Sequence, residues 1–139
     1  MPSHRRPRRR QLAAPEIESL QHIPVSLLRR VRLVRTNFLP PAADGMTIGR
    51  FIFLRGDKIL DGPNTLLAHE LVHVRQFFEQ GPVRFIYRYL SDYLTNLIRL
   101  KNHHQAYLQI PFEIEAREEA AGWEELTRLR EEERPKRNA

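Results

Sequence analysis

The chain has 139 residues, enough for one domain, and its composition excludes several classes of protein. It contains no cysteine, which excludes disulfides and thiolate metal ligands. No apolar run is long enough to span a bilayer, and the residues after the Arg-rich first ten are too polar for a secretory signal. We therefore expect a cytoplasmic protein without a transmembrane segment. The net charge of +6 fits nucleic acid, an anionic membrane surface or an acidic partner, and it also fits simple solubility.

The composition divides the chain into three segments. Residues 1–14 are rich in Arg and Pro and offer almost nothing to a core, so we predict a disordered basic arm. Residues 15–130 are predicted to form one domain, and residues 131–139 a charged C-terminal tail. The arm has two interpretations, a polyanion contact such as nucleic acid, or a solubilising leader. No aromatic residue interleaves its arginines to stack on bases, which favours the leader.

The first half of the domain is predicted to alternate short helices and strands. A short helix is expected at residues 15–21, and residues 25–35 fit a helix that runs into a short strand. Residues 38–45 contain two adjacent prolines and Asp-Gly, which predict a loop. Residues 46–54 are dense in β-branched and aromatic side chains and form the best strand candidate. That strand could pack on the following helix, and a free edge on it could also pair with an extended peptide.

Residues 65–80, TLLAHELVHVRQFFEQ, are predicted to form an apolar and largely buried helix. A start signal precedes them at residues 61–64 (Asp-Gly-Pro-Asn), and Gly-Pro at residues 81–82 is a stop signal. At about 100° per residue, His69 and His73 lie one turn apart on one face of this helix. Buried imidazoles are costly unless a partner satisfies them, so the pair marks a site of some kind.

The two histidines belong to an H-E-x-x-H motif, His69-Glu70-Leu71-Val72-His73. Imidazoles at this spacing can fill adjacent corners of a zinc tetrahedron, and Glu70 can act as the general base on a zinc-bound water. The alternative interpretation is a pair of core histidines whose hydrogen bonds are satisfied within the protein. The helix signals around the motif favour the metal site. A catalytic zinc needs a third protein ligand, which must come from another part of the chain.

Two further helices are predicted in the second half. Residues 83–100 form an amphipathic helix, and residues 102–104 (Asn-His-His) the turn that follows it. Its aromatic and basic character permits a membrane-surface role, but we favour packing against the core, because the chain offers little else to build one. The last helix is expected at about residues 105–130. The apolar stripe of the first of these helices consists of Ile86, Leu90, Leu94 and Leu97.

The H-E-x-x-H motif is followed forty residues later by Glu113-Ile114-Glu115-Ala116, and the two together resemble the gluzincin metallopeptidases. In that family a Glu that opens E-x-x-A on a later helix completes the zinc site. The stretch HELVHVRQ is also similar to the small HELxHxxQ metallopeptidase-like domains associated with bacterial contractile injection systems. The resemblance covers residues 46–123. It implies a small zincin-like α+β fold, mostly helical, with a short β-sheet packed on the H-E-x-x-H helix.

By the same resemblance the chain binds one zinc ion through His69, His73 and Glu113, and Glu70 is the catalytic base. The chain departs from the family pattern at Arg117, where many gluzincins have an Asp that supports the metal ligands. No motif identifies the residue that stabilises the oxyanion, for which Tyr107 is a candidate.

The helical phase separates Glu113 from the neighbouring Glu115. The two side chains point about 160° apart, so only one of them can face a metal. Glu113 shares its side with Ile110 and several alanines, as expected where this helix packs on another, whereas the side of Glu115 carries further glutamates.

From the motif and the resemblance together we predict a zinc-dependent metallopeptidase acting on a peptide or protein substrate. The alternative is a non-catalytic zinc-binding domain that serves as an assembly or interaction module.

Overall fold

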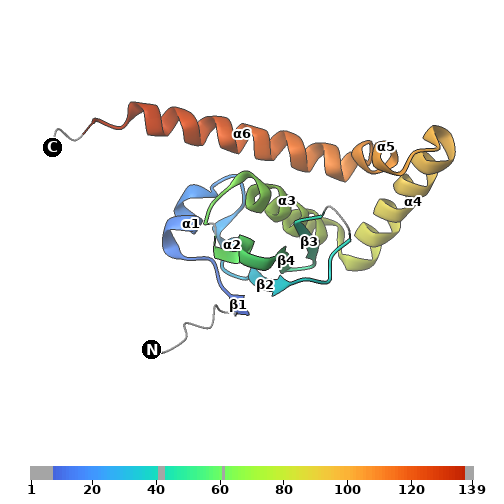
Figure 1. The fold of residues 1–139 in the computed structure, drawn as a ribbon, viewed down its shortest axis with the longest axis horizontal. Coiled ribbons are helices and arrows are strands. Elements are labelled where there is room, and N and C mark those ends of the chain that lie inside the picture. Colours follow the sequence, from blue (N-terminus) through green and yellow to red (C-terminus); the bar gives the residue numbers. More distant parts are fainter. Residues whose placement is uncertain (1–7, 41–42, 61, 137–139) are drawn as a thin grey trace.

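The computed structural model describes residues 8–40, 43–60 and 62–136, and it has an α+β fold that is mostly helical, with one four-stranded sheet (Figure 1). The sheet order is β1-β2-β4-β3, with β2 and β4 parallel and the other neighbours antiparallel. The α+β class predicted from the sequence is therefore confirmed. The strands are β1 (Arg9–Arg10), β2 (Arg32–Thr36), β3 (Gly45–Ile48) and β4 (Phe51–Arg55).

The helix α3 (Thr65–Gln80) lies at the centre of the molecule, between the sheet and the long helix α6 (Figure 1). Its apolar side contacts a core that includes Leu33 and Ile52 of the sheet, both 0% exposed. The predicted helix that runs into a strand is present as α2 followed by β2. The other helices are α1 (Ala14–Ser19), α2 (Val25–Leu28), the 3-10 helix η1 (Gly56–Leu60), α4 (Pro82–Leu100), α5 (His103–Leu108) and α6 (Pro111–Glu133).

Both ends of α3 agree with the sequence signals. The Asn64 side chain caps the N-terminus by accepting a hydrogen bond from the Leu67 amide at 2.9 Å. Gly81 ends the helix with a φ of 80°, a left-handed value that glycine adopts at little cost. Asp61, which belongs to the predicted start signal, lies outside the described residues. The capped helix holds the two histidines in a fixed register.

The predicted single strand at residues 46–54 is instead a β-hairpin. Ile48 of β3 pairs with Phe51 of β4, so Gly49 and Arg50 form a two-residue turn in which Gly49 has a φ of 61°. A glycine with positive φ at the first position of a two-residue loop is a common hairpin solution. The hairpin makes β3 an edge strand of the sheet and brings it against α3. Residues 41–42 of the predicted preceding loop lie outside the described part of the chain.

The prediction of a disordered arm at residues 1–14 is wrong for the part that the structure describes. Arg9 and Arg10 form β1 and pair with β2, and the Leu12 side chain is only 7% exposed. Arg10 donates hydrogen bonds to both oxygens of the buried Glu16 and to the Ile59 carbonyl. At least one arginine of the supposed polyanion-binding arm is thus held within the fold. Residues 1–7 of the arm lie outside the described residues.

The predicted helix at residues 105–130 is broken into two. Helix α5 begins at His103, so Asn102 is a helix cap and the two histidines after it are helical rather than part of a turn. Helix α6 begins at Pro111, because proline fits the first turn of a helix but not its interior. It continues to Glu133, three residues into the segment predicted as the C-terminal tail. Residues 137–139 of that tail are not described.

The predicted core packing of residues 83–100 is also wrong. Three residues of the predicted stripe face outward in α4, where Ile86, Leu90 and Leu94 are 45%, 51% and 54% exposed, and the fourth, Leu97, is half-buried. The buried side chains of α4 are Phe85 and Asn96. No helix in the part of the chain that the structure describes is long and apolar enough to cross a membrane.

Candidate metal centre

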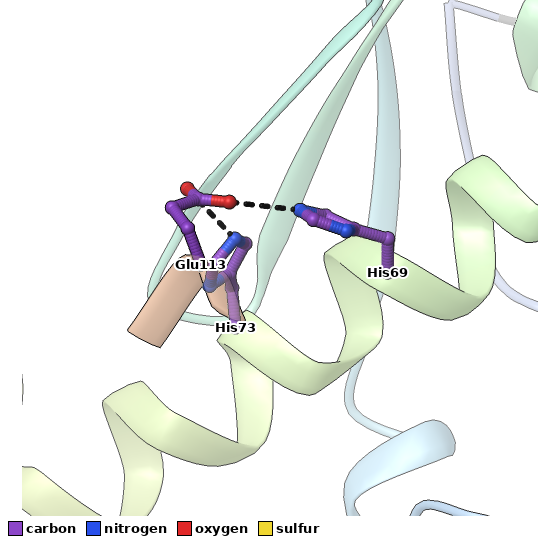
Figure 2. A group of neighbouring side chains, drawn as sticks. All are labelled: His69, His73 and Glu113. Atoms are coloured by element: carbon purple, nitrogen blue, oxygen red, sulfur yellow. Dashed lines mark hydrogen bonds and ion pairs between the residues drawn. The ribbon is translucent and has the colours of Figure 1, made fainter. Parts of the chain in front are cut away.

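The side chains of the predicted metal site converge from two helices (Figure 2). His69 and His73 project from successive turns of α3, and Glu113 projects from the first turn of α6. The close approach of the two helices depends on small side chains, because Ala116 and Ala120 of α6 are buried against α3. The predicted face of α6, with Glu113 among alanines, is therefore the one that packs.

Each histidine meets one oxygen of the same carboxylate. The His69 Nε2 lies 3.0 Å from Glu113 Oε2, and the His73 Nε2 lies 3.1 Å from Glu113 Oε1. The His69 and His73 ring centroids are 5.0 Å apart and nearly perpendicular. One ligand atom from each residue lies within 4.8 Å of the other two, so these three side chains form a group that could hold a metal ion.

Burial and the neighbouring histidines have opposite effects on the pKa of Glu113. Burial raises the pKa of Glu113, but hydrogen bonds from His69 and His73 outweigh burial and hold that pKa well below its usual value. Burial likewise lowers the pKa of His73, while the hydrogen bond and the charge of Glu113 raise it above its usual value. Glu113 therefore keeps its negative charge, which a protonated His73 or a metal cation can compensate, so protons compete with a metal for His73.

The motif glutamine fixes the orientation of His73. The Nδ1–H of His73 donates to Gln76 Oε1 at 2.8 Å, so the Nε2, which faces Glu113, is the ring nitrogen that could act as a ligand. The amide of Gln76 is itself oriented, because its Nε2 donates to the Phe112 carbonyl at 3.0 Å and to Glu115 at 3.1 Å. This chain of contacts gives a physical reason for a Gln three residues after the second His.

Glu70 lies on the side of α3 that faces the edge strand. Its carboxylate accepts a hydrogen bond from the Thr47 hydroxyl at 2.7 Å, and its side chain is packed closely against Gly45. A Cβ at Gly45 would come within 3.2 Å of Glu70 Oε1, so a larger residue there would displace the carboxylate. Burial raises the pKa of Glu70, although the charge of His73 and the Thr47 hydroxyl counteract this effect. The hairpin that the sequence failed to predict thus positions the predicted base.

Two tyrosine hydroxyls contact Glu113. Tyr107, the predicted candidate, donates to Oε2 at 3.1 Å, and Tyr89 of α4 donates to Oε1 at 2.8 Å. Burial and the negative charge of Glu113 raise the pKa of both tyrosines, so they remain protonated donors. Tyr89 is not among the predicted site residues, because the amphipathic pattern does not distinguish it from its neighbours Tyr87 and Tyr93. Tyr89 differs from these two tyrosines because it lies on the side of α4 that packs towards Glu113.

Arg117 does not support the histidines. Its guanidinium donates to the Leu108 carbonyl and so joins the end of α5 to α6. Among the described residues, the structure gives no hydrogen-bond partner for the Nδ1 of His69. The support that the family pattern provides through Asp is therefore missing, and His73 is the better anchored of the two histidines.

Comparison of the chain with protein-family models, with curated proteins and with solved structures finds no match.

Proposed function

We propose that this chain is a zinc metallopeptidase of the gluzincin type with a zincin-like fold. The observation that carries the proposal is the convergence of His69, His73 and Glu113 beside a buried Glu70. Two imidazoles and one carboxylate are a donor set of catalytic zinc sites, which leave one position open. Donors about 2.0–2.2 Å from a tetrahedral ion lie ~3.3–3.6 Å apart. The separations of 3.0 Å from His69 to Oε2 and 3.1 Å from His73 to Oε1 of Glu113 are slightly shorter, so the side chains need to move apart only a little to admit an ion.

Zinc, when bound, supplies a Lewis acid that polarises the scissile carbonyl and makes water acidic near neutral pH. Glu70 accepts the proton of the attacking water, and Thr47 holds its carboxylate in place. The same carboxyl then delivers the proton to the leaving amine. Tyr107 is 39% exposed, and its hydroxyl, which donates to Glu113 Oε2, is the candidate that would turn to a substrate oxyanion.

The edge strand offers a path for the substrate. Gly45 and Thr47 of β3 both contact Glu70, and β3 is the last strand in the order of the sheet. An extended peptide that pairs with the outer edge of β3 would pass beside Glu70 and the metal group. We therefore propose unstructured peptide segments as the substrate class.

A second candidate function is a zinc-binding module without turnover. One observation favours it: Glu70 is only 6% exposed, so a substrate must displace neighbouring atoms to reach it. Both functions share the metal, and they differ in what Glu70 does.

The experiment that tests the proposal compares the wild type with Glu70→Gln. We expect both proteins to bind about one zinc per chain, measured by native mass spectrometry. We also expect the substitution to lower hydrolysis of an unfolded protein substrate by about 10²- to 10⁴-fold, because it removes the base and keeps the ligands. Hydrolysis at an equal rate by both proteins would refute the role of Glu70. A zinc-loaded wild type that cleaves nothing in a broad peptide library would favour the binding module.

A further inference from the structure

The outward side of α4 carries a continuous row of large apolar side chains, which we call the outer stripe. On a helix these residues fall within an arc of about 80°, over a length of ~22 Å. Figure 1 shows α4 along one edge of the molecule. The stripe consists of Val83, Tyr87, Leu90, Leu94 and Ile98, which are 84%, 73%, 51%, 54% and 78% exposed.

Exposed arginines line one flank of this stripe. Arg84, Arg88 and Arg99 lie about 100–160° around the helix from Val83, on the same side of the stripe. The one acidic residue of α4 is Asp92. The helix therefore combines an uninterrupted apolar stripe with a positively charged flank, and the net charge of the chain is also positive at +6.

We propose that α4 docks on an anionic lipid bilayer, with the outer stripe in the interfacial region and the arginine flank among the headgroups. An amphipathic helix with aromatic and aliphatic residues on one face and arginines beside them is suited to this position. Anionic headgroups attract the flank, and burial of the stripe removes apolar surface from water. This inference is independent of the proposed peptidase function.

The charge distribution argues against a second copy of the chain as the partner. In an antiparallel twofold pair of α4 helices, the same flank of each copy meets, so Arg84 and Arg88 would approach Arg99 of the other copy. Like charges at that position are repulsive. A parallel pair would set the arginine flank against the other side of α4.

That other side is already occupied by α5. Asn96 donates to the Ala106 carbonyl at 3.1 Å, and the Tyr93 hydroxyl lies 2.6 Å from the His103 Nδ1. The outer stripes of two copies therefore cannot pair without either repulsion between arginines or overlap with α5. A flat anionic surface can contact the stripe and the arginine flank at the same time.

The test is co-sedimentation of the full chain with vesicles of phosphatidylcholine alone and of phosphatidylcholine with phosphatidylserine. We expect binding to the anionic vesicles that weakens as salt increases. Leu94→Glu should lower this binding at least ~10-fold, because it introduces a charge into the stripe. Leu126→Glu is the matched control, since Leu126 is equally exposed at 56% but lies on α6. Replacing both Arg84 and Arg99 by Gln should reduce the preference for anionic vesicles.

Three outcomes would overturn the proposal: no binding to anionic vesicles, an equal loss in the Leu126→Glu control, or equal binding to neutral vesicles. A wild type that forms a dimer in light scattering, and becomes monomeric on Leu94→Glu without any vesicle binding, would assign the stripe to a second copy instead. Circular dichroism of each variant verifies that its helices are retained. Glu70→Gln should bind vesicles like the wild type, which separates this inference from the proposed catalysis.

Discussion

Helices α3 and α4 follow one another in the chain and are both amphipathic, yet they differ in which side chains they bury and which they expose. Helix α3 buries polar groups, among them Glu70, His73 and Gln76, and each of these has a hydrogen-bond partner. Helix α4 exposes large apolar groups such as Leu94 and Ile98. Both arrangements cost free energy in an isolated soluble domain. Each helix departs from ordinary partitioning where the proposed metal or the proposed lipid surface would compensate the cost.

The largest expected effect is the loss of metal binding at the buried polar groups of α3 when Glu113 is replaced. Glu113→Gln removes the charge that meets both histidines, so we expect zinc affinity to fall by more than ~100-fold, beyond the range seen for supporting residues. Glu115→Gln is the matched control on the same helix. Competition with a chromophoric chelator measures both affinities.

The control is not expected to be silent. Glu115 accepts hydrogen bonds from Arg75 at 2.6 Å and from Gln76 at 3.1 Å, so it touches the residue that orients His73. Its side chain is 49% exposed, which limits the effect to ~10-fold or less. If Glu115→Gln released the metal while Glu113→Gln retained it, the assignment of the packed face of α6 would be wrong.

A second pair of substitutions probes the apolar side chains of the two helices. Leu67 of α3 is 3% exposed, and Leu67→Ala should lower the free energy of unfolding by about 2–5 kcal/mol. Leu94 of α4 is 54% exposed, and Leu94→Ala should change it by ~0.5 kcal/mol or less. Urea denaturation in the presence of a chelator measures both. A cost above ~1 kcal/mol for Leu94→Ala would mean that the outer stripe is covered in solution.

The sequence predicts α3 and the convergence of His69, His73 and Glu113 because the information is local. Asn64 and Gly81 mark the ends of the helix, and the spacing of His69 and His73 fixes their common face. The phase of the later helix then selected Glu113 over Glu115, since alanines indicate where another helix approaches. These features need only the helical period and residue sizes.

The remaining features depend on partners that local pattern does not reveal. Gly49 interrupts a run of strand-forming residues, and only the pairing of Ile48 with Phe51 makes it a turn. Arg9 and Arg10 form a strand because β2 has an open edge beside them. The apolar period of α4 was recognised, but periodicity does not say which face the rest of the chain covers, and Tyr89 was missed for the same reason.

A smaller effect on metal binding than that of Glu113→Gln is expected at Gln76, the buried amide beside His73. Gln76→Leu keeps the size of the side chain and removes the acceptor for the Nδ1–H of His73, so the ring is free to adopt the other tautomer. We expect zinc affinity near pH 8 to fall by ~10- to 100-fold. Gln21→Leu, an exposed position in the turn after α1, is the control and should leave affinity unchanged.

The pH profile distinguishes an orienting role of Gln76 from a merely structural one. In the metal-free protein, burial lowers the pKa of His73, but Glu113, Glu70 and the hydrogen bond to Gln76 raise it above its usual value. Below that pKa a proton must leave His73 before zinc binds, so apparent affinity falls as the pH falls. Gln76→Leu removes one of the contributions that raise the pKa, so the decline should begin at a lower pH than in the wild type. A lower affinity with an unchanged pH profile would mean that Gln76 only fills space between α3 and α6.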